Sequence, residues 1–258
     1  GPILTKKIKV AELHHLYGLQ FFGRKYLSSF AKIITITHAL KDDVVQQFRI
    51  AEGKILVVPS GIDISRFTNN NPQEEAQRQL GITSTKPLVA YVGSLEKWKG
   101  YQTFLDASEI LNEIVQFVVI GGTSEQITTL KGQYPQVLFL GFIQQQTIAQ
   151  NERFADVLVA PNSGREIIST RHTSPLKIFE YMTSGVPIVA SRVTSICEIL
   201  SDSNAVLVSP DSPQALADGI RAVLGDTVRA LARAKQAQSD VGIYDWRHRT
   251  ESILSFIG

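Results

Sequence analysis

Short apolar runs alternate with amphipathic stretches along most of the chain, a pattern that predicts parallel βαβ units. The runs are rich in Val, Ile and Leu, as expected for strands of a sheet that is covered on both faces. The predicted strands are Leu88–Gly93, Gln116–Ile120, Val137–Gly141, Val157–Pro161, Pro187–Ser191 and Ala205–Val208. The helices expected between and after them are Lys99–Glu113, Glu125–Tyr134, Gln145–Ala155, Pro175–Ser184, Thr194–Leu200 and Pro213–Leu224. Residues 87–240 are therefore predicted to form one complete, doubly wound, Rossmann-like domain.

The first 60 residues carry a shorter version of the same pattern. Strands are expected at Lys9–Leu13, Ile33–Thr37 and Ile55–Pro59, and helices near Leu19–Ala31 and at Ala39–Phe48. This is too little for a complete Rossmann-like domain, so residues 1–60 are predicted to be a partial one. The polar stretch around Glu74–Gln79 predicts a surface connection, and residues 61–86 are assigned to an interdomain connection. The predicted fold class is α/β with parallel sheets.

Charge and cysteine content narrow the functional classes. The 26 basic and 24 acidic residues nearly cancel, so no long-range field suggests a nucleic-acid partner. The single cysteine, Cys197, excludes an internal disulfide and a cysteine zinc cluster, and it fits a reducing compartment. No apolar run approaches the roughly 18 residues of a membrane span, and no signal peptide opens the chain. We expect a cytoplasmic protein.

The segment Thr173–Ser191, T-S-P-L-K-I-F-E-Y-M-T-S-G-V-P-I-V-A-S, carries the most specific signal. Thr173 or Ser174 can cap a helix, and Pro175 fits its first turn, where a missing N–H costs nothing. Gly185 is expected to end that helix before the strand I-V-A-S begins. The segment therefore predicts a helix followed by a buried strand.

Two charged residues of this helix suggest its chemistry. Lys177 and Glu180 are three positions apart and share one face. The free N–H groups of a helix amino end, near Ser174–Leu176, suit a diphosphate, and the macrodipole and a lysine ammonium add to that attraction. A carboxylate one turn further on can accept hydrogen bonds from a ribose or sugar diol. The segment thus predicts a nucleotide-sugar site, the alternative being an ordinary helix on which both side chains are solvated.

The segment resembles the donor-site helix of the family-4 retaining glycosyltransferases, which have the GT-B architecture of two facing Rossmann-like domains. Further matches lie at Glu12–Leu16, Val57–Phe67, Tyr91–Gly100, Val137–Phe142, Phe154–Asn162 and Tyr244–Arg249. The likeness covers about residues 8–257, and it implies that residues 241–258 form a helix crossing back to the N-terminal domain. Because the first half of the family's N-terminal domain has no match, we expect a fragment or one part of a split enzyme.

The resemblance implies transfer of a sugar from a nucleoside-diphosphate sugar, UDP or GDP most readily, to a carbohydrate or lipid-linked acceptor in glycan or polysaccharide synthesis. It further implies retention of configuration without a protein nucleophile, a metal or another cofactor. No Asp-x-Asp lies in a plausible loop, and Asp42–Asp43 falls in a helical pattern, where a surface position is expected. Cations and helix amino ends are then left to neutralise the charge that grows on the leaving diphosphate.

Lys99 matches the family lysine that faces the diphosphate, the alternative being a solvated lysine at a helix start. Many relatives carry an arginine directly after the strand glycine, here Gly93, whereas this chain has the uncharged Ser94. We expect Lys177 to fill that gap, although an ammonium does not reproduce the fork of a guanidinium.

Glu180 matches the second glutamate of the family's Glu-x7-Glu motif, which is assigned to the ribose hydroxyls. The first glutamate falls on His172, which either bonds a hydroxyl or phosphate or is an exposed loop histidine without a role. Arg171 belongs to the segment expected to pass over the sugar pocket. His14 matches the histidine near the reacting sugar, and its predicted catalytic role competes with that of a satisfied structural histidine. Glu198 resembles a recurrent glutamate, with a capping or surface role equally open.

Two loops complete the predicted pocket. Gly121 and Gly122 follow a predicted strand, so the backbone can approach a ligand closely, the alternative being a tight turn. The loop Gly141–Ile143, with Phe142 and Ile143, is expected to offer backbone groups to the base.

The stretch Gly18–Phe30 mixes aromatic residues with Arg24 and Lys25, which leaves open a peripheral contact with the inner face of the membrane; a core-packing helix is the competing interpretation. Unsupported sheet edges in residues 1–60 invite self-association. A non-catalytic nucleotide-sugar module that needs a partner chain is the main alternative function. An oxidoreductase is disfavoured because no Gly-x-Gly-x-x-Gly follows a strand.

Overall fold

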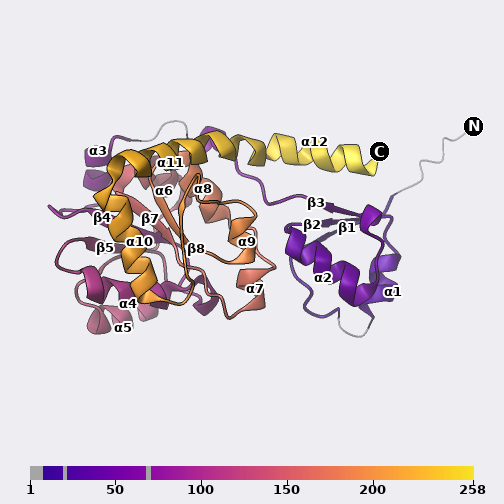
Figure 1. Ribbon diagram of the computed structural model, residues 1–258, viewed down its shortest axis with the longest axis horizontal. Coiled ribbons are helices and arrows are strands. Elements are labelled where there is room, and N and C mark those ends of the chain that lie inside the picture. The colour runs from indigo at the N-terminus through magenta and orange to yellow at the C-terminus, as the bar shows by residue number, and fades with distance from the viewer. Residues whose placement is uncertain (1–7, 20–21, 68–70) are drawn as a thin grey trace, which may run out of the picture.

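The computed structural model describes residues 8–19, 22–67 and 71–258, which form two parallel sheets side by side (Figure 1). The smaller sheet has the order β1 (Val10–Leu13), β2 (Lys32–Thr35), β3 (Ile55–Val57). Helices α1 (Gly23–Ser28) and α2 (His38–Phe48) lie on one side of it. The predicted helix Leu19–Ala31 is thus shorter, and its residues 20–21, like residues 1–7 of the predicted partial domain, lie outside the described residues.

The larger sheet contains six parallel strands in the order β6-β5-β4-β7-β8-β9. Their bounds are Leu138–Gly141 (β6), Gln116–Ile120 (β5), Leu88–Val92 (β4), Val157–Ala160 (β7), Ile188–Ser191 (β8) and Val206–Val208 (β9). Each lies within one residue of its predicted ends. The chain order reverses between β4 and β7, which makes the carboxyl ends of these two strands the topological switch point of a doubly wound sheet. The predicted α/β fold with parallel sheets is confirmed.

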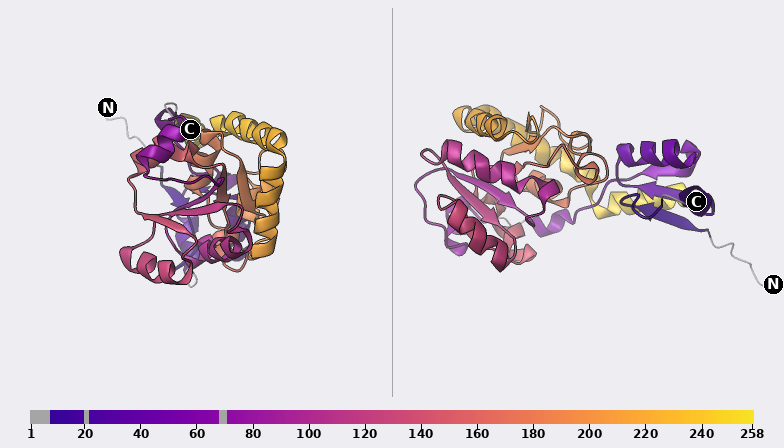
Figure 2. Two further views of the ribbon diagram at one scale, coloured as in Figure 1. Left: turned by 90° about the vertical axis from the view of Figure 1, so that its left-hand side faces the viewer. Right: turned by 90° about the horizontal axis from the view of Figure 1, so that it is seen from below.

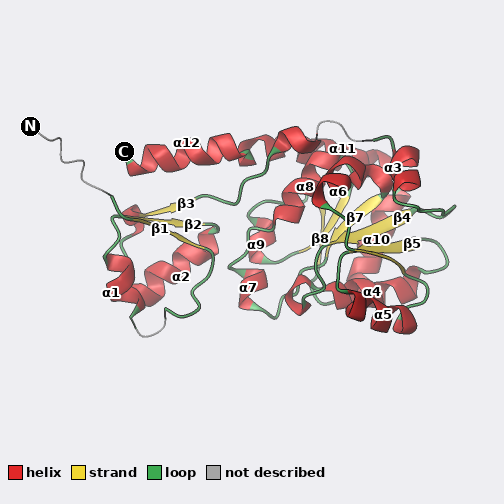
Figure 3. Ribbon diagram, turned by 180° about the vertical axis from the view of Figure 1, so that it is seen from behind, coloured by secondary structure: helices red, strands yellow, loops and turns green. Residues whose placement is uncertain are grey.

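Helices cover both faces of the larger sheet (Figure 3). One face packs on α4 (Tyr101–Leu111), α5 (Ser124–Gln133) and α10 (Pro213–Gly225), through a core that includes Phe104, Leu130 and Ile220. The other face packs on α6 (Gln145–Asn151), α8 (Leu176–Ser184) and α9 (Thr194–Cys197), through a core that includes Ile148, Phe179 and Ile196. Double coverage explains why the strands are apolar almost throughout.

Two helices differ from the sequence-based expectation. The polar stretch predicted to be a surface connection is a helix, α3 (Gln73–Gln79), whose Ala76 is fully buried. No helix was expected at α11 (Thr227–Asp240), which buries Ala230, Ala234 and Ala237. Both helices contact the core through alanine, so their apolar stripes are too weak to stand out from the polar positions around them. Residues 68–70 of the predicted connection lie outside the described part.

The chain ends in α12 (Trp246–Ile257), which runs back along the smaller sheet on the side away from α1 and α2 (Figures 1 and 2). Arg249 of this helix donates to Glu12 at 2.6 Å and to the carbonyl of Pro59 at 2.9 Å. Lys32 lies 4.1 Å from the centre of the Phe256 ring. A helix long and apolar enough to cross a membrane is not found in the described ranges. The domain boundaries themselves stay predictions.

Candidate functional site

A cavity of about 550 Å³ opens at the carboxyl edge of the larger sheet, beside the switch point. Its lining includes seven residues of the predicted site: Gly93, Ser94, Gly121, Gly122, Phe142, Ile143 and Glu180. They come from four separate segments that the parallel topology carries to one edge. A second cavity of about 420 Å³, at the opposite edge near Asp156 and Pro187, contains none of them. The switch-point cavity is therefore the candidate site.

Glycines let the loops of this cavity approach each other. Gly121 has φ +118°, and a Cβ there would lie 2.1 Å from the carbonyl oxygen of Gly93. Its N–H donates to the carbonyl of Gly141 at 2.7 Å. Gly121 therefore allows the loops after β4, β5 and β6 to come into backbone contact. It does more than form the tight turn that was considered as the alternative. A side chain at position 121 would push the walls of the cavity apart.

The amino end of α8 is left without a side-chain cap. The helix begins at Leu176 after Pro175. The prediction of a cap at Thr173 or Ser174 with Pro175 in the first turn is wrong, because Pro175 is itself the residue that precedes the helix and no side chain caps it. The Ser174 hydroxyl accepts from the Ser60 N–H at 3.0 Å instead. Gly185, at φ +74°, ends the helix as predicted. The first N–H groups of α8 thus lack a side-chain acceptor, which an anion can supply.

Lys177 presents a buried cation on this first turn. Its Nζ is inaccessible to solvent, has no hydrogen-bond partner among the described residues, and lies 4.4 Å from the Tyr91 ring centre. Burial, together with the nearby charge of Lys99, lowers the pKa of Lys177 to about 7, against the opposing effect of Glu180. A buried ammonium without an acceptor is unfavourable, so the site is electrostatically prepared for an anion.

Lys99 lies beside the cavity rather than on its wall. Its Nζ donates to the Ser94 hydroxyl at 2.5 Å and is 3.4 Å from Glu96. Gly100, at φ +70°, allows the backbone after Lys99 to pack on Pro161 at the end of β7. Ser94, which stands where relatives carry an arginine, thus accepts a hydrogen bond from Lys99. The charge of Lys99 also acts on Lys177, so the two predicted cations lie near each other.

Glu180 lines the cavity one turn further along α8. Its carboxylate accepts from the Gln145 amide at 2.8 Å. Burial raises the pKa of Glu180, while the Gln145 hydrogen bond and the charge of Lys177 oppose that rise. One carboxylate oxygen remains for a hydroxyl pair of a ligand. Sequence reasoning missed Gln145, because nothing distinguishes it within the polar run Q-Q-Q.

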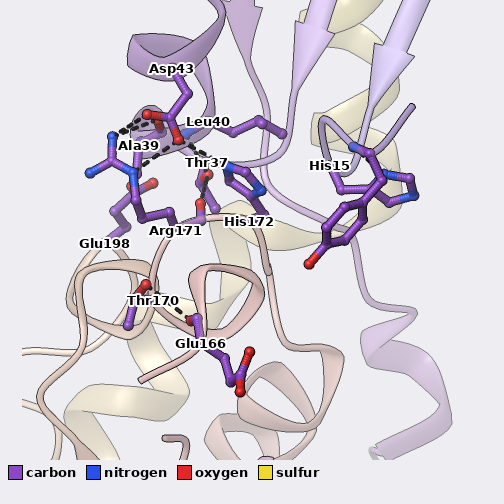
Figure 4. A network of polar contacts seen from close by, with 11 residues as sticks. His15, Thr37, Ala39, Leu40, Asp43, Glu166, Thr170, Arg171, His172 and Glu198 are labelled. Atoms are coloured by element: carbon purple, nitrogen blue, oxygen red, sulfur yellow. Dashed lines mark hydrogen bonds and ion pairs between the residues drawn. The ribbon is translucent and has the colours of Figure 1, made fainter. Parts of the chain in front are cut away.

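His172 does not line this cavity. It contacts Asp43 of α2, the helix that packs on the smaller sheet (Figure 4). Its Nε2 is 2.8 Å from Asp43, and the residue is only 8% exposed. The expectation of an exposed loop histidine is wrong, and so is the surface position expected for Asp43, whose side chain is 13% exposed. The predicted contact of His172 with the donor substrate gains no support, because the Nε2 atom of His172 is bonded to Asp43 of α2.

His14 follows β1 and is also separate from the cavity. Its Nε2 is 3.0 Å from Glu12, and its side chain is 58% exposed. The ring is thus accessible, and its catalytic role stays a prediction. A group of three or more metal-ligating side chains is not found within the described ranges.

A doubly wound, Rossmann-like sheet beside a smaller parallel sheet agrees with the GT-B class of glycosyltransferase folds, and solved structures share this fold. A glycosyltransferase from Rickettsia africae ESF-5 superposes with a TM-score of 0.81 at 17% identity, over 96% of this chain and 69% of that one. Anabaena Alr3699/HepE, solved in complex with UDP, superposes with a TM-score of 0.77 at 22% identity, over 95% of this chain and 71% of that one.

The chain belongs to the family of glycosyl transferases group 1, whose model matches residues 86–226. An uncharacterized glycosyltransferase, MJ1607 of Methanocaldococcus jannaschii, is 29% identical over 78% of this chain and 53% of its own length. A D-inositol 3-phosphate glycosyltransferase of Xylanimonas cellulosilytica is 28% identical over 86% of this chain and 55% of its own length. The chain thus spans about half the length of these curated relatives.

Proposed function

We propose that this chain binds the nucleoside-diphosphate sugar of a metal-independent, retaining hexosyltransferase of the family-4 type. The observation that carries the proposal is the ammonium of Lys177 on the uncapped first turn of α8. Its Nζ is buried and has no hydrogen-bond partner among the described residues, with Lys99 nearby and Glu180 on the next turn. In this assignment the two lysines and the helix amino end hold the diphosphate. Glu180 accepts from the ribose diol, and the loops at Gly121 and Phe142 border the base.

The chemistry follows from the charges in the site. Cleavage of the anomeric C–O bond develops negative charge on the leaving diphosphate, and fixed cations at that point lower the barrier. We propose no protein nucleophile, so the acceptor hydroxyl attacks from the face that the diphosphate leaves. The new bond from the acceptor oxygen to the anomeric carbon forms as the bond to the diphosphate breaks, and the leaving diphosphate takes the hydroxyl proton. The acceptor is proposed to be a carbohydrate or a lipid-linked sugar. We also propose a peripheral lipid contact through the exposed Phe22 and Tyr26, which lie beside Arg24 and Lys25, and self-association through the edges of the smaller sheet.

A nucleotide panel tests the proposal directly. UDP, GDP and ADP, and then their sugars, are added to the protein during thermal unfolding. The correct nucleotide at a hundredfold its dissociation constant is expected to contribute about 2.7 kcal/mol of stability, a rise in melting temperature of about 6 °C. Glu180→Ala should lose most of this shift, whereas Glu125→Ala, an exposed glutamate on α5, should keep it. No shift with any nucleotide would contradict the proposal.

Donor affinity is also expected to depend on pH through Lys177. With a pKa of about 7 in the free protein, Lys177 loses its proton as the pH rises, whereas a bound diphosphate favours the charged form. Affinity should therefore fall above pH 7 by at most about tenfold per pH unit, with proton uptake on binding. Calorimetry with a UDP-sugar in buffers of different ionisation enthalpy measures both quantities, because its diphosphate does not titrate in this range.

Lys177→Arg is the matched variant for this pH dependence, since a guanidinium stays charged throughout. Its affinity should be nearly constant between pH 6 and 9. A wild-type profile equally flat over that range would contradict the assignment of Lys177 as the titrating group.

A further inference from the structure

The segment Arg171–Ser174 leads directly into the amino end of α8, yet its polar groups are held by the other sheet. The Thr37 hydroxyl donates to the Arg171 carbonyl at 2.5 Å. The Ser174 hydroxyl accepts from the Ser60 N–H at 3.0 Å, just after β3. Thus both ends of the segment before Pro175 are fixed by residues on the small-sheet side, 114 and more positions earlier in the chain.

Asp43 is the centre of these contacts (Figure 4). It accepts two hydrogen bonds from the Arg171 guanidinium, at 2.8 and 2.9 Å, and a third contact of 2.8 Å from His172. Arg171 also donates to the Ala39 carbonyl at 3.1 Å. A bidentate guanidinium–carboxylate pair fixes orientation as well as distance, so the carboxylate sets both the position and the angle of the segment.

A reciprocal contact runs from the larger sheet to α2. The carboxylate of Glu198, just after α9, accepts from the His38 N–H at 2.8 Å and from the Ala39 N–H at 3.0 Å. It therefore occupies the amino end of α2, while Asp43 on the next turn of α2 holds Arg171. Burial alone would raise the pKa of Asp43, but the hydrogen bonds from Arg171 and His172 lower it, so the carboxylate is charged at neutral pH.

We propose that Asp43 is a positioning residue for the donor helix: through Arg171 and His172 it fixes the segment that delivers Pro175 and the first turn of α8 to the diphosphate. The assignment of that turn to a diphosphate rests on the proposed function. The smaller sheet is then part of the donor site, although none of its residues lines the cavity at the switch point.

The test compares Asp43→Asn with Asp42→Asn. Asp42 is the adjacent carboxylate on the same helix, is exposed, and acts on Arg171 only through space. Amide hydrogen exchange at residues 173–177 is measured without ligand, and UDP-glucose affinity is measured by calorimetry. Asp43→Asn is expected to speed the exchange of this segment and to weaken affinity, each by about tenfold. Asp42→Asn should change both by less than about twofold.

Thr37→Val is the second variant. It removes the hydroxyl that donates to the Arg171 carbonyl, and because the same hydroxyl accepts from the Leu40 N–H as the cap of α2, exchange over α2 is measured alongside. It should change exchange at residues 173–177 and affinity in the same direction as Asp43→Asn. If Asp43→Asn fails to fold, Arg171→Gln, which breaks the same charge pair from the other side, takes its place. Arg171→Gln should add little in the Asp43→Asn background, since both substitutions break one linkage.

The outcomes separate the two proposals. Unchanged exchange at residues 173–177 in both variants overturns the positioning role, and so does faster exchange with wild-type affinity. A uniform rise in exchange over the whole chain would show a merely structural contribution and would also overturn it. Failure of the wild-type protein to bind any nucleotide sugar overturns the proposed function, while the exchange comparison, which needs no ligand, still decides whether Asp43 holds the segment.

Discussion

Lys177→Met is expected to remove nearly all affinity for the nucleotide sugar while leaving the fold at least as stable as in the wild-type protein. The side chain keeps its length and apolar stem but loses an ammonium that is buried against the Tyr91 ring without a hydrogen-bond partner among the described residues. A charge-assisted hydrogen bond to a diphosphate contributes about 1.5–3 kcal/mol, and the macrodipole of α8 acts on the same group. Loss of this hydrogen bond alone therefore corresponds to about a 10- to 150-fold loss in affinity, measured by calorimetry with UDP-glucose.

We expect the same substitution to stabilise the fold, although it weakens ligand binding. Because burial lowers the pKa of Lys177 below its value in the unfolded chain, the ammonium destabilises the fold at neutral pH, and that cost fades as the pH rises toward 10. Lys177→Met removes the cost, so denaturant unfolding at pH 7 should give a higher free energy of unfolding. Lys97→Met is the control, an exposed lysine near the same loop. A stable Lys177→Met variant with wild-type affinity would mean that the diphosphate binds elsewhere.

The sequence predicted the larger sheet well because its strands are short apolar runs whose spacing leaves few other arrangements. It also predicted which loops meet at the candidate cavity, since parallel strands carry Gly93, Gly121 and Phe142 to one edge. Helices α3 and α11 were missed because they pack through alanine, which carries little apolar signal.

Contacts between the two sheets could not be predicted from the same pattern. Asp43 and Arg171 are separated by 128 positions, and each on its own has the composition of a solvated surface. Only the packing of α2 on the segment before α8 makes them partners. Ser174 shows the same limit of prediction from sequence. Its hydroxyl could cap the following helix, but it accepts a hydrogen bond from the distant Ser60 N–H instead. Glu198 does cap a helix, although that helix belongs to the other sheet.

Glu152 is an acidic residue that is buried in the fold at a cost in stability. It lies between α6 and β7, is 0% exposed, and neither carboxylate oxygen has a hydrogen-bond partner among the described residues. Burial, with a smaller contribution from the charge of Glu180, raises its pKa well above the usual 4.5. A carboxyl group in such surroundings keeps its proton at pH values where the unfolded chain has lost it.

Glu152→Met is therefore expected to stabilise the protein by about 2 kcal/mol at neutral pH, since an apolar side chain of similar length removes two unpaired oxygens from the core. Between the pKa of the unfolded chain and the raised pKa of the folded state, the native protein holds one more proton. The contribution of Glu152 to the free energy of unfolding of the wild-type protein thus falls as the pH rises, by at most about 1.4 kcal/mol per pH unit. Urea unfolding at pH 5 and pH 8 should show a gap between variant and wild type that widens at the higher pH.

Glu113→Met, at an exposed glutamate, provides the comparison and should leave stability within about 0.5 kcal/mol at both pH values. Nucleotide affinity of Glu152→Met should match the wild type, because Glu152 does not line the cavity. A variant that is stabilised but no longer binds nucleotide would mean that Glu152 contributes to the donor site. It would do so by acting on Glu180, since the charges of the two carboxyl groups interact. A destabilised variant would instead mean that the carboxyl group is satisfied in the native protein, and the predicted pH dependence would then disappear as well.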